Sequence, residues 1–247
     1  YMKWTKVHIS DKKEEKRPLI ILSDSDYAFA NNFSRFHNLS EDDLVVGVHA
    51  QAKYAQRRWP IENFVKVLNY LEKKYGAKII EFGENNQPEI KKGISLVGKC
   101  TIKQTAAVLQ KCTFLLCNDS LLLHMAGALD IPVVGILGPA PYWTRMPFNT
   151  ISLWCYPKKG CRGCILYQKD FNKFGMVCEK EYPECMYNIK PYEVIKTVED
   201  LLGRLALQKK VKIMKSFPKL SIVMSVYNGE KLSLIHISEP TRPLYIS

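Results

Sequence analysis

The chain has 247 residues, of which 47% are hydrophobic, and carries a formal net charge of +12 at pH 7. This apolar content indicates a globular protein with a core, and no apolar run approaches the ~20 residues of a membrane span. The positive charge predicts an acidic partner, which would be a nucleotide diphosphate, an anionic membrane surface or a nucleic acid. Nucleic acid ranks last, because the sequence has no motif that combines basic and aromatic surface residues.

The first predicted elements follow a charged segment, residues 1–17. Residues 19–22 form a short apolar run that predicts a strand, and Asp24 is a suitable N-cap for a helix after it. This helix would direct four apolar side chains inward, namely Tyr27, Phe29, Ala30 and Phe33.

From residue 44 on, apolar runs alternate with segments of helical spacing. Strands are predicted at 44–49, 78–82, 95–97, 114–117, 132–137 and 151–154. Helices are predicted from Ile61 to Tyr75, after Thr101, after Ser120 and from Pro191 to Leu202. This alternation predicts an α/β fold with a doubly wound, Rossmann-like parallel sheet.

Residues 114–141 are the centre of this pattern. A buried strand ends in a polar turn at residues 118–120, a helix with His124 follows, and a second buried strand comes after it. Ligands of doubly wound sheets bind at the carboxyl ends of the strands, and the free N–H groups of a helix N-terminus suit a phosphate. Asp119, Ser120 and His124 are therefore candidate binding residues. The alternative is a simple helix cap beside a packed histidine.

This stretch resembles the signature of the bacterial lipopolysaccharide heptosyltransferases, glycosyltransferase family nine, and residues 57–60 (Arg-Arg-Trp-Pro) match a second motif of that family. The resemblance covers residues 44–203. It implies the C-terminal, nucleotide-binding half of a two-domain GT-B glycosyltransferase. The implied reaction transfers heptose or a related sugar from an ADP-sugar to a lipid-linked lipopolysaccharide core acceptor. It would be inverting, would need no metal or cofactor, and would take place in the cytoplasm at the inner membrane.

The resemblance also assigns roles to single residues. Arg57 and Arg58 would supply the cation that reaches the phosphates, and Glu84 would bond the hydroxyls of the ribose or the sugar. The family has glycine where Leu121 stands, so this side chain would crowd the pyrophosphate. The implied nucleotide-sugar-binding residues are Arg57, Arg58, Glu84, Asp119, Ser120, Leu121 and His124.

The family's catalytic base lies near the start of its N-terminal domain and would therefore precede Tyr1. We expect this chain alone to bind a nucleoside diphosphate weakly and to catalyse no transfer. A second hypothesis is a non-catalytic domain that binds a nucleotide sugar or a protein and retains only the fold. Leu121 favours it, as do Ala50 and Gln51, which replace the Pro and Gly of the family's first loop.

Five cysteines cluster between residues 155 and 185, and four of them have spacings compatible with zinc ligands. The four candidate metal ligands are Cys161, Cys164, Cys178 and Cys185. A structural zinc site and a set of reduced cysteines are both compatible with this pattern.

The composition changes after the last predicted helix. We expect residues 1–43 to be the remnant of an N-terminal domain with its crossover, 44–206 the nucleotide-sugar-binding domain, and 207–217 a basic linker. The linker is a solvated charge run or a contact with an anionic membrane. Residues 218–231 resemble the first strand of family-two glycosyltransferases, and 232–247 resemble translated sequencing adapter, an artefact without function.

Overall fold

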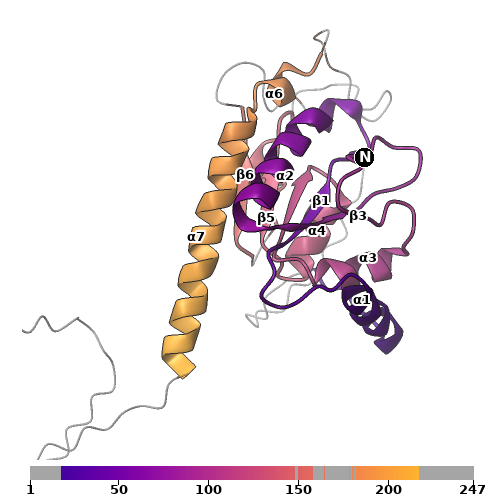
Figure 1. The fold of residues 1–247 in the computed structure, drawn as a ribbon. Coiled ribbons are helices and arrows are strands. Elements are labelled where there is room, and N and C mark those ends of the chain that lie inside the picture. Colours follow the sequence, from indigo (N-terminus) through magenta and orange to yellow (C-terminus); the bar gives the residue numbers. More distant parts are fainter. Residues whose placement is uncertain are drawn as a thin grey trace, which may run out of the picture. The chain divides into compact units, whose positions relative to one another are not determined.

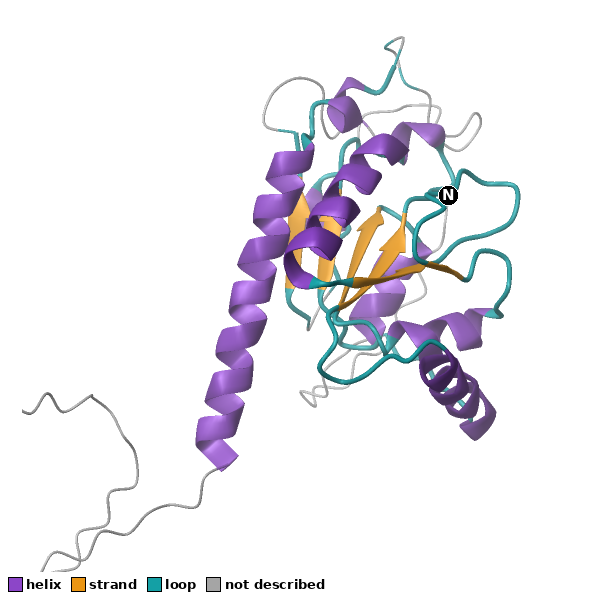
Figure 2. Ribbon diagram, in the orientation of Figure 1, coloured by secondary structure: helices purple, strands orange, loops and turns teal. Residues whose placement is uncertain are grey.

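The computed structural model describes residues 18–147, 150–157, 164, 178, 180 and 182–216. The predicted α/β fold is confirmed, since six parallel strands form one sheet with the order β3-β2-β1-β4-β5-β6 (Figures 1 and 2). Their bounds are β1 Val45–His49, β2 Lys78–Glu81, β3 Ile94–Ser95, β4 Phe114–Asn118, β5 Val133–Ile136 and β6 Ser152–Cys155.

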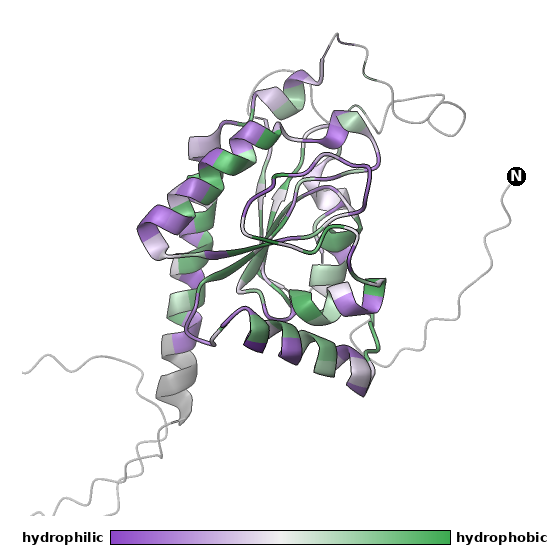
Figure 3. Cartoon of the chain, turned by 45° about the vertical axis from the view of Figure 1, so that its right-hand side comes forward, coloured by the Kyte–Doolittle hydropathy of each residue, from purple (hydrophilic) through white to green (hydrophobic). Residues whose placement is uncertain are grey.

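Helices cover both faces of the sheet, which is why β1, β4 and β5 are buried along their whole length. The helices α1, α3 and α4 lie on one face, and α2 and residues 191–201 lie on the other (Figures 1 and 2). Figure 3 shows hydrophobic residues on the central strands and both kinds of residue on α1 and α2. The helix bounds are α1 Asp24–Phe36, α2 Ile61–Tyr75, α3 Ile102–Leu109, α4 Leu121–Ala128, α6 Glu184–Tyr187 and α7 Pro191–Ser216.

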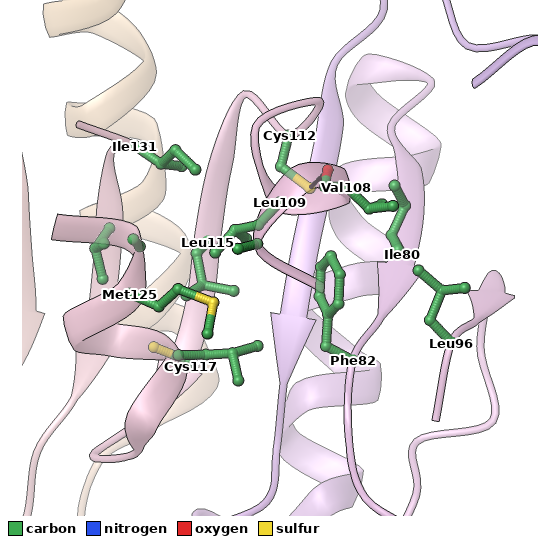
Figure 4. Close-up of a cluster of buried hydrophobic side chains, with 14 of the residues drawn as sticks. Ile80, Phe82, Leu96, Val108, Leu109, Cys112, Leu115, Cys117, Met125 and Ile131 are labelled. Atoms are coloured by element: carbon green, nitrogen blue, oxygen red, sulfur yellow. Dashed lines mark hydrogen bonds between the residues drawn. The ribbon is translucent and has the colours of Figure 1, made fainter. Parts of the chain in front are cut away.

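The core beneath α1, α3 and α4 is continuous and lies against the middle strands. Figure 4 shows part of it, in which side chains of β2 and β4 meet those of α3 and α4. Labelled members are Ile80, Leu109, Cys112, Leu115 and Met125. This apolar layer fixes the positions of the strand ends and of the loops that follow them.

Two predictions about the first elements are wrong. Residues 19–22 form no strand, and Leu19 and Ile21 are exposed. The N-cap of α1 is Ser23 and not Asp24, because Ser23 accepts the N–H of Asp26 while the Asp26 carboxylate accepts the N–H of Ser23.

Of the four side chains expected to face inward from α1, Ala30 and Phe33 are buried and Phe29 is half-buried, whereas Tyr27 is exposed. The helix packs against α3, so the residues that face α3 decide which of its side chains are covered.

Most later elements follow the predicted pattern, although the strand expected at 95–97 is Ile94–Ser95 and the chain turns at Val97. Gly76 ends α2 in the left-handed conformation, at φ +64°, and Thr101 caps α3 with Gln104 as its reciprocal partner. Helix α7 does not end at Leu202 but continues to Ser216, so residues 207–216 of the expected linker are helical.

The chain divides into two units, residues 1–201 and 202–247. The sheet and the cavities described below belong to the first unit. Among the described residues, no helix combines the length and the apolarity needed to cross a bilayer.

Candidate functional site

A cavity of about 630 Å³ opens at the carboxyl edge of the sheet, where the loops after β1, β2 and β4 meet. The strand register explains this meeting, since Val48 lies beside Glu81 and His49 lies beside Cys117. Six of the seven nucleotide-sugar-binding residues predicted from the sequence line it, namely Arg57, Glu84, Asp119, Ser120, Leu121 and His124. We call this space the Arg57 cavity.

One carboxylate and two guanidinium groups form the charged centre of the Arg57 cavity. Asp119 is 4% exposed, and its Oδ2 lies 3.2 Å from Nη1 of Arg57 and 3.5 Å from Nε of Arg145. The Arg57 side chain is 13% exposed, and its guanidinium also lies over the ring of Tyr54. Burial lowers the pKa of Arg57, an effect that Asp119 opposes and Arg145 reinforces. Within the described residues, one carboxylate thus faces two cations, which leaves one positive charge without a counter-charge.

Ser120 precedes α4 at the N-cap position, but its hydroxyl does not cap the helix. Its Oγ lies 3.0 Å from Nδ1 of His49, the last residue of β1. Burial lowers the pKa of His49 to about 4, so this imidazole is neutral at pH 7. The pair joins the ends of β1 and β4 and leaves the first-turn N–H groups of α4 without a side-chain cap. Such N–H groups suit an anionic ligand.

Gln51 ties the loop after β1 to the loop after β2. Its Nε2 donates to the backbone oxygen of Glu84 at 3.0 Å, and its Oε1 accepts the backbone N–H of Glu84 at 2.7 Å. A Cβ at Gly83 would lie 2.5 Å from Nε2 of Gln51, so glycine is required for this close approach. The side chain that replaces the family's glycine therefore fixes the position of Glu84.

Arg58, the seventh predicted residue, does not line the Arg57 cavity. Its Nε donates to the oxygen of Ala52 at 2.9 Å, and its Nη2 donates to Oε1 of Gln87 at 2.6 Å. It lines a separate cavity of about 470 Å³, which we call the Arg58 cavity, together with Tyr182 and Tyr187.

Asn118, the last residue of β4, and Trp59, which follows the two arginines, anchor the loop after β1. The buried Asn118 accepts the backbone N–H of Trp59 at 3.2 Å and donates Nδ2 to the oxygen of Ala50 at 2.6 Å. Trp59 is 1% exposed, packs edge-on against Phe64 and donates Nε1 to the oxygen of Ile189. The positions of Arg57 and Arg58 therefore depend on buried contacts that make no use of their charge.

Among the lining residues that sequence reasoning did not assign to the site are three basic ones, namely His49, Lys53 and Arg145. Arg145 lies in the loop after β5, and parallel strands all end at the same edge of the sheet, so topology contained the signal. His124 lies where it was expected. Burial lowers its pKa, Asp119 opposes this effect and Arg145 reinforces it.

The predicted zinc ligands are only partly described, since Cys161 lies outside the described residues. Cys185 is buried, and Sγ of Cys178 donates to the oxygen of Tyr182 at 3.8 Å. In the described part of the chain, no group of three or more His, Cys, Asp or Glu side chains could hold a metal ion. The zinc site stays a prediction.

A doubly wound sheet with a cation-lined cavity at its carboxyl edge defines the class of ligand-binding α/β domains. The family model of glycosyltransferase family 9 (heptosyltransferase) matches residues 6–173, and the chain belongs to this family. The match ends before residues 218–231, which also lie outside the described residues, so their resemblance to family-two enzymes stays a prediction.

The chain also resembles curated relatives in sequence and solved structures in fold. The chain is 24% identical over 171 residues to lipooligosaccharide heptosyltransferase 2 of Campylobacter jejuni, covering 64% of this chain and 51% of that protein. It resembles in fold a family 9 glycosyl transferase from Veillonella parvula, with TM-score 0.59, 21% identity, and coverage of 76% and 54%. It also resembles the dodecameric iron-containing heptosyltransferase TibC of enterotoxigenic E. coli, solved in complex with ADP-D-β-D-heptose, with TM-score 0.57, 18% identity, and coverage of 67% and 47%. The chain thus spans about half the length of these proteins.

Proposed function

We propose that this chain is the donor-binding part of a glycosyltransferase that moves heptose or a related sugar from an ADP-sugar to a lipopolysaccharide core acceptor. The observation that carries the proposal is the Arg57 cavity, which gathers six of the seven residues implied by the family resemblance. Support for the donor comes from TibC, a heptosyltransferase of similar fold described in complex with ADP-D-β-D-heptose. Support for the acceptor comes from the relative named as a lipooligosaccharide heptosyltransferase.

The proposed reaction is an inverting displacement at the sugar carbon that bears the diphosphate, without a metal. When this carbon–oxygen bond breaks, negative charge builds on the departing ADP. Arg57, with the N–H groups at the start of α4, would stabilise that charge because both are in place before the reaction. Asp119 holds the guanidinium of Arg57 at 3.2 Å, which fixes its orientation.

The base that activates the acceptor hydroxyl is proposed to come from an N-terminal domain. The acceptor is proposed to be lipid-linked, and the net charge of +12 would favour approach to an anionic membrane surface at the cytoplasmic face of the inner membrane. Membrane attraction of this kind weakens as the salt concentration rises.

Calorimetric titration with ADP tests the donor site. The full 247-residue chain is expected to bind ADP and to bind orthophosphate far more weakly, because orthophosphate lacks the ribose hydroxyls that Glu84 would bond. It is expected to transfer no sugar to a lipid-core acceptor. Absence of ADP binding at millimolar concentration would reject the proposal.

A non-catalytic binding domain is the second candidate, and Leu121 is the observation that favours it. This side chain is 60% exposed and lies at the rim of the Arg57 cavity, where the family has glycine. If it blocks the diphosphate, ADP will bind neither to this chain nor to a longer form that includes a catalytic domain. ADP binding together with transfer by that longer form would exclude the second candidate.

A further inference from the structure

We propose that Arg145 is a second phosphate-binding cation, which makes the Arg57 cavity selective for a nucleoside diphosphate over a monophosphate. This inference rests on the proposed function and adds a specificity residue to it. Arg145 lines the cavity and lies in none of the motifs that carry the family resemblance.

Two arginines from different loops converge on one oxygen atom. Nη1 of Arg57 and Nε of Arg145 lie 3.2 and 3.5 Å from Oδ2 of Asp119. Arg57 comes from the loop after β1, and Arg145 from the loop after β5. An anion in this cavity would therefore have two guanidinium groups within reach, which suits a chain of two phosphoryl groups.

The charges of this cluster are not balanced by any residue that the structure describes. Two guanidinium groups share one carboxylate, which leaves one positive charge. The Nε atoms of Arg57 and Arg145 are buried and make no hydrogen bond to any described residue. Because these Nε atoms are shielded, an anion in the cavity would pair with the other N–H groups of the two guanidinium ions and would balance the remaining positive charge. The Arg145 side chain is one-third exposed and can reach such an anion.

The support beneath Arg145 is rigid. Its backbone N–H donates to the oxygen of Tyr142, at the start of a short 3₁₀ helix, Tyr142–Thr144. The Tyr142 ring stacks on Trp154 of β6 with centroids 4.2 Å apart and planes at 6°. Pro147 packs so closely on α4 that a Cβ at Gly127 would lie 2.1 Å from it. These contacts fix the backbone that carries Arg145 before any ligand binds, which reduces the entropy cost of binding.

The monophosphate and the diphosphate differ in what they offer to the two arginines. AMP has one phosphoryl group, which Arg57 alone can pair. ADP has a second phosphoryl group, which would pair with Arg145. Loss of Arg145 should therefore weaken ADP binding and leave AMP binding almost unchanged. A mere counter-ion of Asp119 would change the binding of both nucleotides by the same factor.

The experiment compares calorimetric titrations of the full chain with ADP and with AMP. Arg145→Ala is expected to weaken ADP binding about ten-fold and AMP binding less than two-fold. Arg145→Lys keeps the charge without the planar fork and should fall between the parent and Arg145→Ala. Arg35→Ala is the matched control, because it removes the same charge from an exposed site outside the cavity, and it should bind both nucleotides as the parent does.

Three outcomes overturn the inference. An unchanged ADP affinity in Arg145→Ala refutes it while the proposed function stands, and so does an equal loss for ADP and AMP. Failure of the parent chain to bind ADP overturns both the proposed function and the inference. Arg145→Gln, which retains most of the packing, gives the same test if Arg145→Ala does not fold, and circular dichroism decides which variant is used.

Discussion

Arg57 and Arg58 are neighbours in the chain and carry the same charge, yet they line different cavities. Arg57 shares a buried carboxylate with Arg145, so its cavity has excess positive charge. Arg58 donates to Ala52 and Gln87, so two of its donors already have acceptors within the protein. The difference teaches that a basic motif indicates a binding site for an anion only through those cations whose N–H donors are not already bonded to acceptors in the protein.

The largest expected effect is a loss of stability on replacing Asn118, which holds the loop that carries Arg57 and Arg58 and therefore supports both cavities. Asn118 accepts from Trp59 and donates to Ala50, and it is fully buried. Asn118→Ala leaves two buried backbone groups without partners, at about 1–3 kcal/mol each, so the free energy of unfolding should fall by about 2–6 kcal/mol. Urea denaturation at pH 7 measures it.

The control for this variant is Asn32→Ala, an exposed change on α1, which should alter stability by less than about 0.5 kcal/mol. If Asn118→Ala lowers the free energy of unfolding no more than the control does, Asn118 does not support the loop after β1, which carries Arg57 and Arg58.

The next effect is a pH dependence of stability that comes from His49, which lines only the Arg57 cavity. Burial lowers the pKa of His49 to about 4, against 6.5 for an ordinary histidine, so the unfolded chain binds more protons between these values. His49 does not change the free energy of unfolding above pH 6.5, and it lowers that free energy by about 3 kcal/mol as the pH falls toward 4. Urea denaturation of the parent and of His49→Asn across this range measures the difference.

His49→Asn should flatten this part of the pH profile, and His37→Asn, at the end of α1, should retain it. A parent profile that is flat from pH 6.5 to 4 would contradict the assignment. Asp43 does not affect this window: its pKa is lowered to about 2, first by its bond from Lys78, so its contribution to stability is present above its ordinary pKa of 3.8 and is lost toward pH 2.

The arginine pair itself gives the third effect. Arg57→Ala should weaken ADP binding by roughly ten- to a hundred-fold, because one charge-assisted contact contributes about 1.5–3 kcal/mol. Arg58→Ala is the matched control and should change ADP affinity by less than about three-fold, since Arg58 lines the other cavity. Equal losses in the two variants would remove the distinction between the cavities, and no loss in Arg57→Ala would remove its phosphate role.

Apolar periodicity was sufficient to predict most of the fold. The runs that became β1, β4 and β5 are apolar at nearly every position, which is typical of strands covered on both faces. Gly76 and Thr101 mark helix ends by local chemistry alone. Residues 19–22 show the limit of this reasoning, because an apolar run becomes a strand only where a neighbouring strand offers free backbone groups.

The site was harder to predict than the fold, because the role of each side chain depends on the residues it contacts, and these come from loops far apart in the sequence. Nothing local distinguishes Arg57 from Arg58, and the distinction depends on Asp119, which lies about sixty residues further on. Arg145 follows a strand predicted correctly and could have been placed at the same edge of the sheet. That its charge meets Asp119 is a contact between loops that follow different strands, which no sequence spacing reveals.

The smallest expected effect concerns the rim of the Arg57 cavity. Leu121 is 60% exposed, so removing its side chain loses little buried area. Leu121→Gly should leave ADP affinity unchanged or raise it by up to about three-fold if the side chain crowds the diphosphate. Glycine in the first turn of α4 also lowers helix stability by up to about 1 kcal/mol, so Leu121→Ala serves as the control that retains helix propensity. Tighter ADP binding in both variants identifies crowding, and tighter binding in neither identifies a side chain that the ligand does not meet. If both variants bind ADP more than three-fold more weakly than the parent, Leu121 contacts the nucleotide and the crowding hypothesis is wrong.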